Sequence, residues 1–439
     1  MKKTTLILGI VSMLTISVHA LDITLESAAE LALGNNRALM AGYSDLRILD
    51  RTKRSGWNEF LPEIYAGTGF SRPNQPILFV PGMNSDWNYS IAIGGSLNLS
   101  ASTAYRIGAS RLAWEQGLIG ITEFEHALVR DARKSFLGLL LLRDTISIYE
   151  LMVETAEGRY NRAARRFELG DARKLDMLSY QVAWQNMLPQ LTDLKNSFEI
   201  RQLEFRRLLG LDEKDPVVLI GEIQADEQSW DAAALISSRL SRRYDVQSAQ
   251  KNIEQLKNER GRRISDGLTP AFVFNYDYAP SWGDPFDGSS TRYDGGVLYL
   301  GVAMPLDGFI PNSKKSLAIR EMSDKLEAAE LRFADSLQAG AIEIESAVRN
   351  LNKSASTLRS LELNVELAVE SYDLVSRSYD VGEADYLQVQ TADDEMNTAR
   401  IQLVNEKFNY SAALQDLDFA IASTLDVTAA SIEEEGSNE

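Results

Sequence analysis

The chain of 439 residues contains no cysteine. This absence excludes disulfides, thiolate metal ligands, a cysteine nucleophile, and a lipid anchor on a cysteine at the start of a secreted chain. Histidine is almost as scarce, with only His19 and His126. We expect His126 to be an ordinary helix-surface residue, and we expect neither a catalytic site nor a metal or other cofactor.

The first twenty residues have the parts of a secretion signal. Two early lysines are followed by an apolar run over 6–18 and a small-residue cleavage site over 18–20. The run is shorter than the ~20 residues that a membrane-spanning helix needs. We therefore expect residues 1–20 to be a signal peptide and the mature chain to begin at Leu21.

Basic residues are outnumbered by acidic ones. The chain has 45 Lys and Arg against 63 Asp and Glu, and loss of a signal with two lysines takes the net charge from −18 to −20. This surplus argues against a nucleic-acid partner, because phosphate binding needs clustered Lys and Arg. It fits either simple solubility or an acidic wall around a water-filled duct, and composition does not choose between them.

Proline is confined to a few places. Nine of the eleven prolines lie in two windows, 62–81 and 270–311, and the tracts between them predict long helices that are interrupted twice. Apolar residues recur every ~3.5 residues over 313–380, which is the coiled-coil period, and 104–169 carries a similar stripe. The long helices are predicted over 104–169, 172–210, 313–380 and 383–423.

Each interruption is predicted to form a β-hairpin, over 63–99 and 271–306. Apolar residues alternate with small or polar ones over 87–99, apart from Gly95 at one apolar position, which is the pattern of a strand with two different faces. Shorter runs of the same kind cover 271–278 and 297–306.

The strand predicted over 63–70 is the weakest, because Ile64 and Tyr65 compete for its apolar face. Loops of about 16 residues, rich in Pro, Gly, Asn, Asp and Ser, are expected over 71–86 and 279–294 to join the strands of each hairpin.

The predicted strands fit a membrane. A tilted strand of ~9–11 residues crosses a bilayer, and alternation with aromatic residues near the strand ends is typical of outer-membrane barrels. Those aromatic residues are Phe70, Trp87, Tyr89 and Tyr278. A soluble hairpin packed on a core would alternate equally well, but the secretion signal and the lack of other sheet partners favour the membrane.

The two halves of the chain repeat each other. At an offset of 212, residues 167–180 align with 379–392 and place Gly170 opposite Gly382. One unit is a helix, a hairpin, a long helix, a turn and a long helix. We assign 21–210 to the first repeat, 211–234 to an equatorial linker, 235–423 to the second repeat, and 424–439 to an acidic tail that we expect to be disordered.

Four strands per chain are too few to close a barrel. An open sheet edge in lipid leaves backbone groups unpaired, at several kcal/mol each. The strands must therefore be pooled among copies of the chain. A pooled barrel that continues into a pooled cylinder of helices is a conduit.

Several segments resemble the TolC family of outer-membrane efflux proteins. ITLESAAELALGNN (23–36) resembles the family's opening helix, and FLPEIYAGTGF (60–70) and GLTPAFVFNYDY (267–278) resemble its entries into the strands. The resemblance covers nearly the whole mature chain. It implies a mixed α/β membrane protein, in which α-helical coiled-coil hairpins form a periplasmic α-barrel and four strands per protomer contribute to a shared β-barrel.

The same resemblance implies a function and partners. It implies a homotrimer in the outer membrane that is a passive exit duct of an efflux or type I secretion system and not an enzyme. A periplasmic adaptor, or membrane fusion protein, and an inner-membrane pump would dock at its periplasmic tips. The residues that match the tip motifs are Leu169, Gly170, Asp171, Val381, Gly382 and Glu383.

The chain departs from the family at one place. Well-known members have an acidic pair six and nine residues beyond the second tip glycine, where this chain has Gln388 and Thr391. Nearby acids could replace that ring, or they could be ordinary solvated residues. The candidate gate or lumen acids are Asp176, Asp385 and Asp393.

Two other functions are weighed against the duct. A periplasmic coiled-coil or adhesion protein would explain the heptads but not two hairpins in register with a repeat. A secreted hydrolase would need two carboxylates fixed in one pocket, which long helical repeats do not obviously provide. For a duct, drugs, metal ions and proteins are all compatible cargoes.

Overall fold

The structure is a computed structural model that describes residues 21–72, 87–225, 228, 230–283, 292–381 and 383–422. The predicted signal peptide and the predicted acidic tail lie outside the described residues. Parts of both predicted hairpin loops and the tip residue Gly382 also lie outside them.

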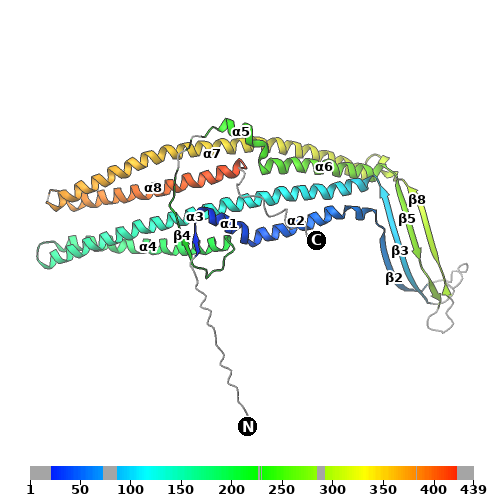
Figure 1. The fold of residues 1–439 in the computed structure, drawn as a ribbon, viewed down its shortest axis with the longest axis horizontal. Helices are drawn as coiled ribbons and strands as arrows, with labels where there is room; N and C mark the ends of the chain where they lie inside the picture. The colour runs from blue at the N-terminus through cyan, green and yellow to red at the C-terminus, as the bar shows by residue number, and fades with distance from the viewer. Residues whose placement is uncertain are drawn as a thin grey trace, which may run out of the picture. The chain divides into compact units, whose positions relative to one another are not determined.

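Four long helices are the largest elements of the described chain (Figure 1). They are α3 (Ser102–Glu168), α4 (Lys174–Leu208), α7 (Lys314–Asp380) and α8 (Tyr386–Ala420). Their bounds lie within one helical turn of the predicted ones. Helices α3 and α7 both have 67 residues, and α4 and α8 both have 35. The two repeats therefore also match in the lengths of their long helices. Helix α4 continues through Pro189 although proline removes one backbone donor.

Shorter helices precede each hairpin. The first repeat has α1 (Leu25–Asn35), α2 (Arg37–Arg54) and the 3₁₀ turn η1 (Ser55–Phe60). The second has α5 (Ala232–Arg239), the turn η2 (Leu240–Arg242) and α6 (Tyr244–Leu268), and η3 (Asp307–Phe309) follows its hairpin. No helix in the described part of the chain has both the length and the apolar character that crossing a membrane requires.

The chain forms two compact units that do not coincide with the two repeats. One unit comprises the described residues within 1–40, 124–237 and 343–439, and the other comprises the described residues within 41–123 and 238–342. Each repeat therefore contributes to both units.

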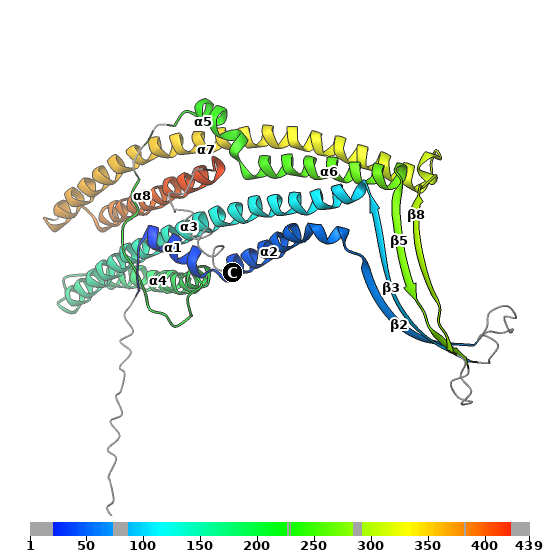
Figure 2. The same cartoon turned by 45° about the vertical axis from the view of Figure 1, so that its right-hand side comes forward.

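In its described residues, the first unit is helical apart from one small sheet. Helix α3 lies beside α4, and α7 lies beside α8, in both Figure 1 and Figure 2. The Phe136 and Phe205 rings join α3 to α4 with centroids 6.3 Å apart. Strand β1 (Leu21–Ile23) pairs in parallel with β4 (Val217–Leu219), so the predicted linker contributes an unpredicted strand that pairs with the start of the first repeat.

The second unit contains one antiparallel sheet. Its four main strands follow the order β2 (Glu63–Ser71), β3 (Asn88–Ser100), β5 (Ala271–Tyr278) and β8 (Gly296–Ala303), as Figure 2 shows. Two hairpins from different repeats thus share one sheet, because β3 pairs with β5.

Two details of the second hairpin differ from the prediction. Strand β8 ends at Ala303 and not at residue 306. The segment predicted as a loop over 279–294 contains two short strands, β6 (Ser281–Gly283), which pairs with β3, and β7 (Arg292–Tyr293), which pairs with β6.

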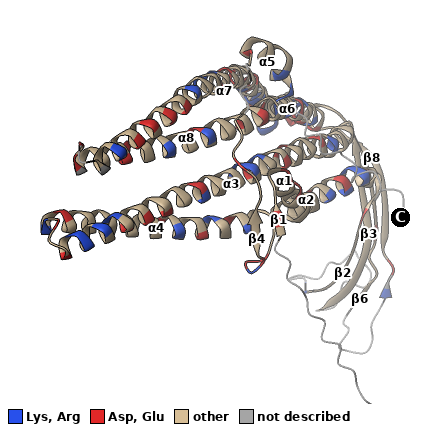
Figure 3. Ribbon diagram, turned by 60° about the vertical axis from the view of Figure 1, so that its left-hand side comes forward, with Lys and Arg blue, Asp and Glu red and all other residues tan. Residues whose placement is uncertain are grey.

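The sheet has one apolar and one polar face. The register places Leu97 opposite Phe274 and Leu99 opposite Phe272, so that apolar side chains form rows across neighbouring strands. The other face carries most of the small or polar residues, together with Val273, Val297 and Tyr299. Ribbon segments that carry Lys, Arg, Asp or Glu are frequent along the helices and rare in the strands (Figure 3).

The register also settles the orientation of the weakest predicted strand. Ile64 pairs with Gly95 and Phe70 pairs with Tyr89, and these residues lie on the apolar face of β3. Tyr65 pairs with Gly94 and lies on the polar face.

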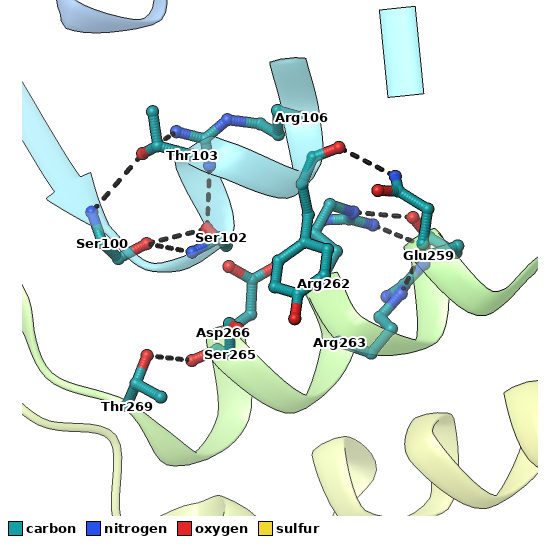
Figure 4. Close-up of polar contacts among 12 residues, drawn as sticks. Ser100, Ser102, Thr103, Arg106, Glu259, Arg262, Arg263, Ser265, Asp266 and Thr269 are labelled. Atoms are coloured by element: carbon teal, nitrogen blue, oxygen red, sulfur yellow. Dashed lines mark hydrogen bonds and ion pairs between the residues drawn. The ribbon is translucent and has the colours of Figure 1, made fainter. Parts of the chain in front are cut away.

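Polar contacts organise the junction between strands and helices (Figure 4). The Ser100 backbone N–H at the end of β3 donates to Thr103 Oγ1 over 3.4 Å, and Arg106 donates to the same Oγ1 over 3.1 Å. On α6, Arg262 Nη2 donates to Glu259 Oε1 over 2.6 Å. The first two contacts satisfy polar groups at the start of α3, and the ion pair on α6 places opposite charges together near the end of that helix.

Candidate functional site at the helical tips

The turn between α3 and α4 exposes an apolar residue next to a glycine. Leu169 is 79% exposed, and Gly170 has a φ of +83°. The Gly170 N–H donates to the Phe167 carbonyl over 3.0 Å, and the Asp171 N–H donates to the Arg166 carbonyl over 2.8 Å. These bonds cap the end of α3, and the left-handed backbone at this position favours glycine.

The turn between α7 and α8 has a matching arrangement in its described residues. Val381 is 72% exposed and follows directly after the end of α7. The Glu383 N–H donates to the Ser378 carbonyl over 2.8 Å. Both turns thus present an aliphatic side chain to solvent, followed by an exposed acid.

Each turn has one more exposed aliphatic residue, a leucine at the start of the next helix. Neither leucine was predicted as a site residue. Leu175 at the start of α4 and Leu387 at the start of α8 are both 67% exposed. The two positions match in the repeat, at the same offset of 212 as the glycines. The repeat alignment therefore pairs Leu175 with Leu387 in the sequence itself. Grouped exposed aliphatic residues mark an interaction surface more often than isolated ones do.

Two of the three candidate acids lie at the starts of helices. Asp176 forms an ion pair with Arg173, with 3.2 Å between Oδ2 and Nε. Asp385 caps α8, because its Oδ1 accepts from the Gln388 N–H over 2.9 Å and Gln388 Oε1 accepts from the Asp385 N–H over 3.0 Å. Negative charge at a helix N-terminus is favourable, so both carboxylates have a local structural role.

The third candidate acid, Asp393, is buried within the single chain. Arg159 Nη1 donates to Asp393 Oδ2 over 2.8 Å, and Asn397 Nδ2 donates to Asp393 Oδ1 over 3.3 Å. Arg159 also donates to Tyr372 Oη over 3.2 Å. This carboxylate joins α8 to α3, and its burial keeps it out of any ring of solvent-facing acids.

The pKa values around this pair follow from burial and charge. Burial lowers the pKa of Arg159, but Asp393 and Tyr372 raise it by more, so the net pKa is raised. Burial raises the pKa of the neighbouring Asp394, and the charge of Asp393 raises it further against the opposing effect of Arg159.

Further contacts brace the two helical hairpins near their tips. The Tyr180 and Tyr379 hydroxyls are 3.5 Å apart and connect α4 with α7. The Tyr160 and Trp184 rings stack with centroids 5.6 Å apart and connect α3 with α4. The tips are therefore held by specific side-chain contacts in addition to their turns.

His126 is half-buried on α3, and burial lowers its pKa. Within the described ranges, no group of three or more His, Cys, Asp or Glu side chains is placed to hold a metal ion.

Comparison with known proteins gives a consistent result. Residues 235–423 match the family model described as outer membrane efflux protein. Nodulation protein T of Rhizobium leguminosarum bv. viciae is 21% identical over 297 residues, which cover 66% of this chain. The chain spans 58% of the length of that curated relative.

Two solved structures have a similar fold. The Campylobacter jejuni CmeC outer membrane channel has a TM-score of 0.75 at 15% identity, over 90% of this chain and 85% of CmeC. The outer membrane protein VceC from Vibrio cholerae has a TM-score of 0.72 at 14% identity, over 90% of this chain and 95% of VceC. The predicted combination of long helical hairpins and a few strands is confirmed.

Proposed function

Because this chain carries an outer membrane efflux protein domain and is a protein of the outer membrane, we propose that it is one protomer of a trimeric, passive exit duct. Its resemblance to the TolC family is confirmed by that domain and by its fold. In the proposed duct, three chains pool their strands in the membrane and their helices in the periplasm.

The sheet is the observation that carries this proposal. Among the described residues, β2 and β8 each pair with one neighbouring strand, so the sheet has two open edges. Its outer strands expose large apolar residues such as Ile64, Leu300 and Val302. Pairing β2 of one copy with β8 of the next would satisfy both edges and place the apolar face against lipid.

The opposite face suits the inside of a duct. Gly67, Ser90, Ser96 and Asn275 are small or polar, and the register places them all on that face. Alternation of apolar residues towards lipid with small or polar residues towards a lumen is the pattern of membrane barrels.

The tips suit a docking function. We propose that Leu169, Gly170 and Asp171 of one turn, with Val381, Gly382 and Glu383 of the other, contact a periplasmic adaptor that recruits an inner-membrane pump. Leu175 and Leu387 would extend this contact. Exposed aliphatic residues on both turns, at equivalent positions, support a partner that engages both repeats.

The acids would act on passing ions. We propose that Asp176 and Asp385, three copies of each, surround the periplasmic mouth and favour cations at low salt. The duct itself would be passive, with its pump selecting drugs, metal ions or proteins as cargo.

Reconstitution tests the proposal. The purified full chain should conduct ions in planar lipid bilayers and should fractionate with the outer membrane. Recovery in the soluble periplasmic fraction would favour a coiled-coil or adhesion protein instead.

A further inference from the structure

Three residues on adjacent strands meet at one point on the polar face of the sheet. Tyr65 of β2 pairs with Gly94 of β3, and Gly94 pairs with Asp277 of β5. A Cβ atom at Gly94 would lie 2.5 Å from Tyr65 Oη and 2.7 Å from Asp277 Oδ1. The phenol and the carboxylate therefore converge above the glycine, and any larger residue there would displace them.

The charge of this face has one sign. Its charged residues are Glu63 and Asp277, and none of the strand residues that the structure describes on this face is a Lys or an Arg. Arg292 of β7 pairs with Trp282, which pairs with Tyr89 of the apolar face. The one cation in these strands therefore lies on the other face of the sheet.

The Asp277 carboxylate has no counter-charge nearby. Within the described part of the chain, neither Asp277 nor Tyr65 forms a hydrogen bond or an ion pair with another side chain. Packing of Tyr65 over Gly94 explains the position of the ring. It does not explain an unpaired carboxylate at the tip of that ring.

We propose that Tyr65 and Asp277 form a weak binding site for organic cations in the sheet-lined part of the duct. An aromatic ring together with a carboxylate is the combination that recognises ammonium groups carrying apolar substituents. The inference rests on the proposed function, since it requires this face to line a water-filled lumen. It assigns cationic, partly apolar solutes as a cargo class that this wall favours over anions.

The absence of cysteine allows a direct test that does not depend on an open periplasmic mouth. Ala92→Cys places a single thiol on the polar face two residues from Gly94 and opposite Gly67. In outer-membrane vesicles carrying the full chain, the thiol is treated with a trimethylammonium thiosulfonate reagent or with its negatively charged sulfonate counterpart. The ratio of the two rates reports the preference for cations.

We expect the cationic reagent to react faster, and we expect tetraethylammonium to protect the thiol. Asp277→Asn removes the carboxylate charge and should lower both the rate ratio and the protection about fivefold. Glu63→Gln is the matched control, because Glu63 lies on the same face but opposite Ser96, farther from the thiol; it should leave both quantities unchanged. Tyr65→Leu should weaken protection by tetraethylammonium, whereas Tyr65→Phe should retain it.

The outcomes separate this inference from the proposed function. If Asp277→Asn and Glu63→Gln have equal effects, the preference comes from diffuse charge and there is no specific site. If Asp277→Asn leaves the rate ratio unchanged, the inference fails, but the proposed duct is not affected. If neither reagent reaches the thiol, the polar face does not line a water-filled lumen, and the proposed function fails with it.

Discussion

Arg159 and Asp393 form a buried ion pair that joins helix α3 to helix α8. Their Nη1 and Oδ2 atoms are 2.8 Å apart, and their side chains are only 14% and 12% exposed. Tyr372 of α7 accepts a second hydrogen bond from Arg159, so a single guanidinium contacts both helices of the second repeat's hairpin. Charges that are buried together in this way depend on each other, because neither is solvated alone.

Removing one partner of this pair should loosen the hairpins locally. Arg159→Ala leaves the Asp393 carboxylate buried without its cation, a change that typically costs about 3–5 kcal/mol. We expect faster amide hydrogen exchange in the first four turns of α8, measured by mass spectrometry. Arg159→Met combined with Asp393→Leu should restore much of the protection. Unchanged exchange in Arg159→Ala would show that the pair does not hold the helices together.

The tips should be needed for export but not for assembly. Leu169→Asp with Val381→Asp places charge on the two exposed aliphatic positions, and we expect it to abolish pump-dependent export while the yield of trimer is unchanged. Leu169→Met with Val381→Ile keeps the surface apolar and should export normally. Normal export by the double Asp variant would exclude these turns as the docking site.

If Asp176 and Asp385 surround the periplasmic mouth as proposed, they should affect ion selectivity. Asp176→Asn with Asp385→Asn should lower cation selectivity in planar bilayers at low salt, with a smaller effect at high salt because ions screen the charges. Asparagine caps a helix about as well as aspartate does, so Asp385→Asn removes the charge but retains the cap of α8. By contrast, Asp385→Ala also loses the cap, at about 0.5–2 kcal/mol.

Comparing Asp385→Asn, which keeps the helix cap, with Asp385→Ala, which loses it, distinguishes the cap's structural role from the effect of the charge on ion selectivity. If Asp176→Asn with Asp385→Asn leaves the reversal potential at low salt unchanged, the acids are a solvated surface and any constriction lies elsewhere.

Much of the helical architecture follows from the sequence. A spacing of ~3.5 residues and the scarcity of proline predict the four long helices to within a turn, and the repeat predicts that α3 and α7 correspond. The alternation in 87–99 predicts the two faces of the sheet. Strand pairing was needed to orient Tyr65, because adjacent Ile64 and Tyr65 are both compatible with an apolar position.

Other features have no periodic signal. Strands β1, β4, β6 and β7 have two or three residues each, too few for an alternation to appear. The heptad pattern marks apolar positions, so it does not reveal that Asp393 is buried against a cation from α3. The exposure of Leu175 and Leu387 likewise depends on where each turn ends.

Stability should depend on pH through Asp418. Burial raises its pKa, and Arg133 opposes this shift only in part. The folded protein therefore holds this proton more tightly than the unfolded chain does, so the group stabilises the fold at acidic pH and loses that contribution as pH rises through the folded pKa. Asp418→Asn should raise the temperature of heat dissociation at pH 7.5 and have little effect at pH 4.

A nearby acid provides the control for this pH effect. Asp416 forms an ion pair with Lys134 over 2.7 Å, so Asp416→Asn removes a favourable interaction and should not raise the dissociation temperature at pH 7.5. A gain of equal size in both variants would contradict the assignment to Asp418, since it would reflect only the reduced negative charge of the whole chain.

The most direct test of the proposed duct is the mass of the assembled particle. Strands β2 and β8 of the described sheet have edges that one chain leaves open, and we expect copies of the chain to close these edges together. Native mass spectrometry of the outer-membrane protein in mild detergent should give three times the mass of the chain without residues 1–20. A stable monomer that retains its strand signal in circular dichroism would contradict the account.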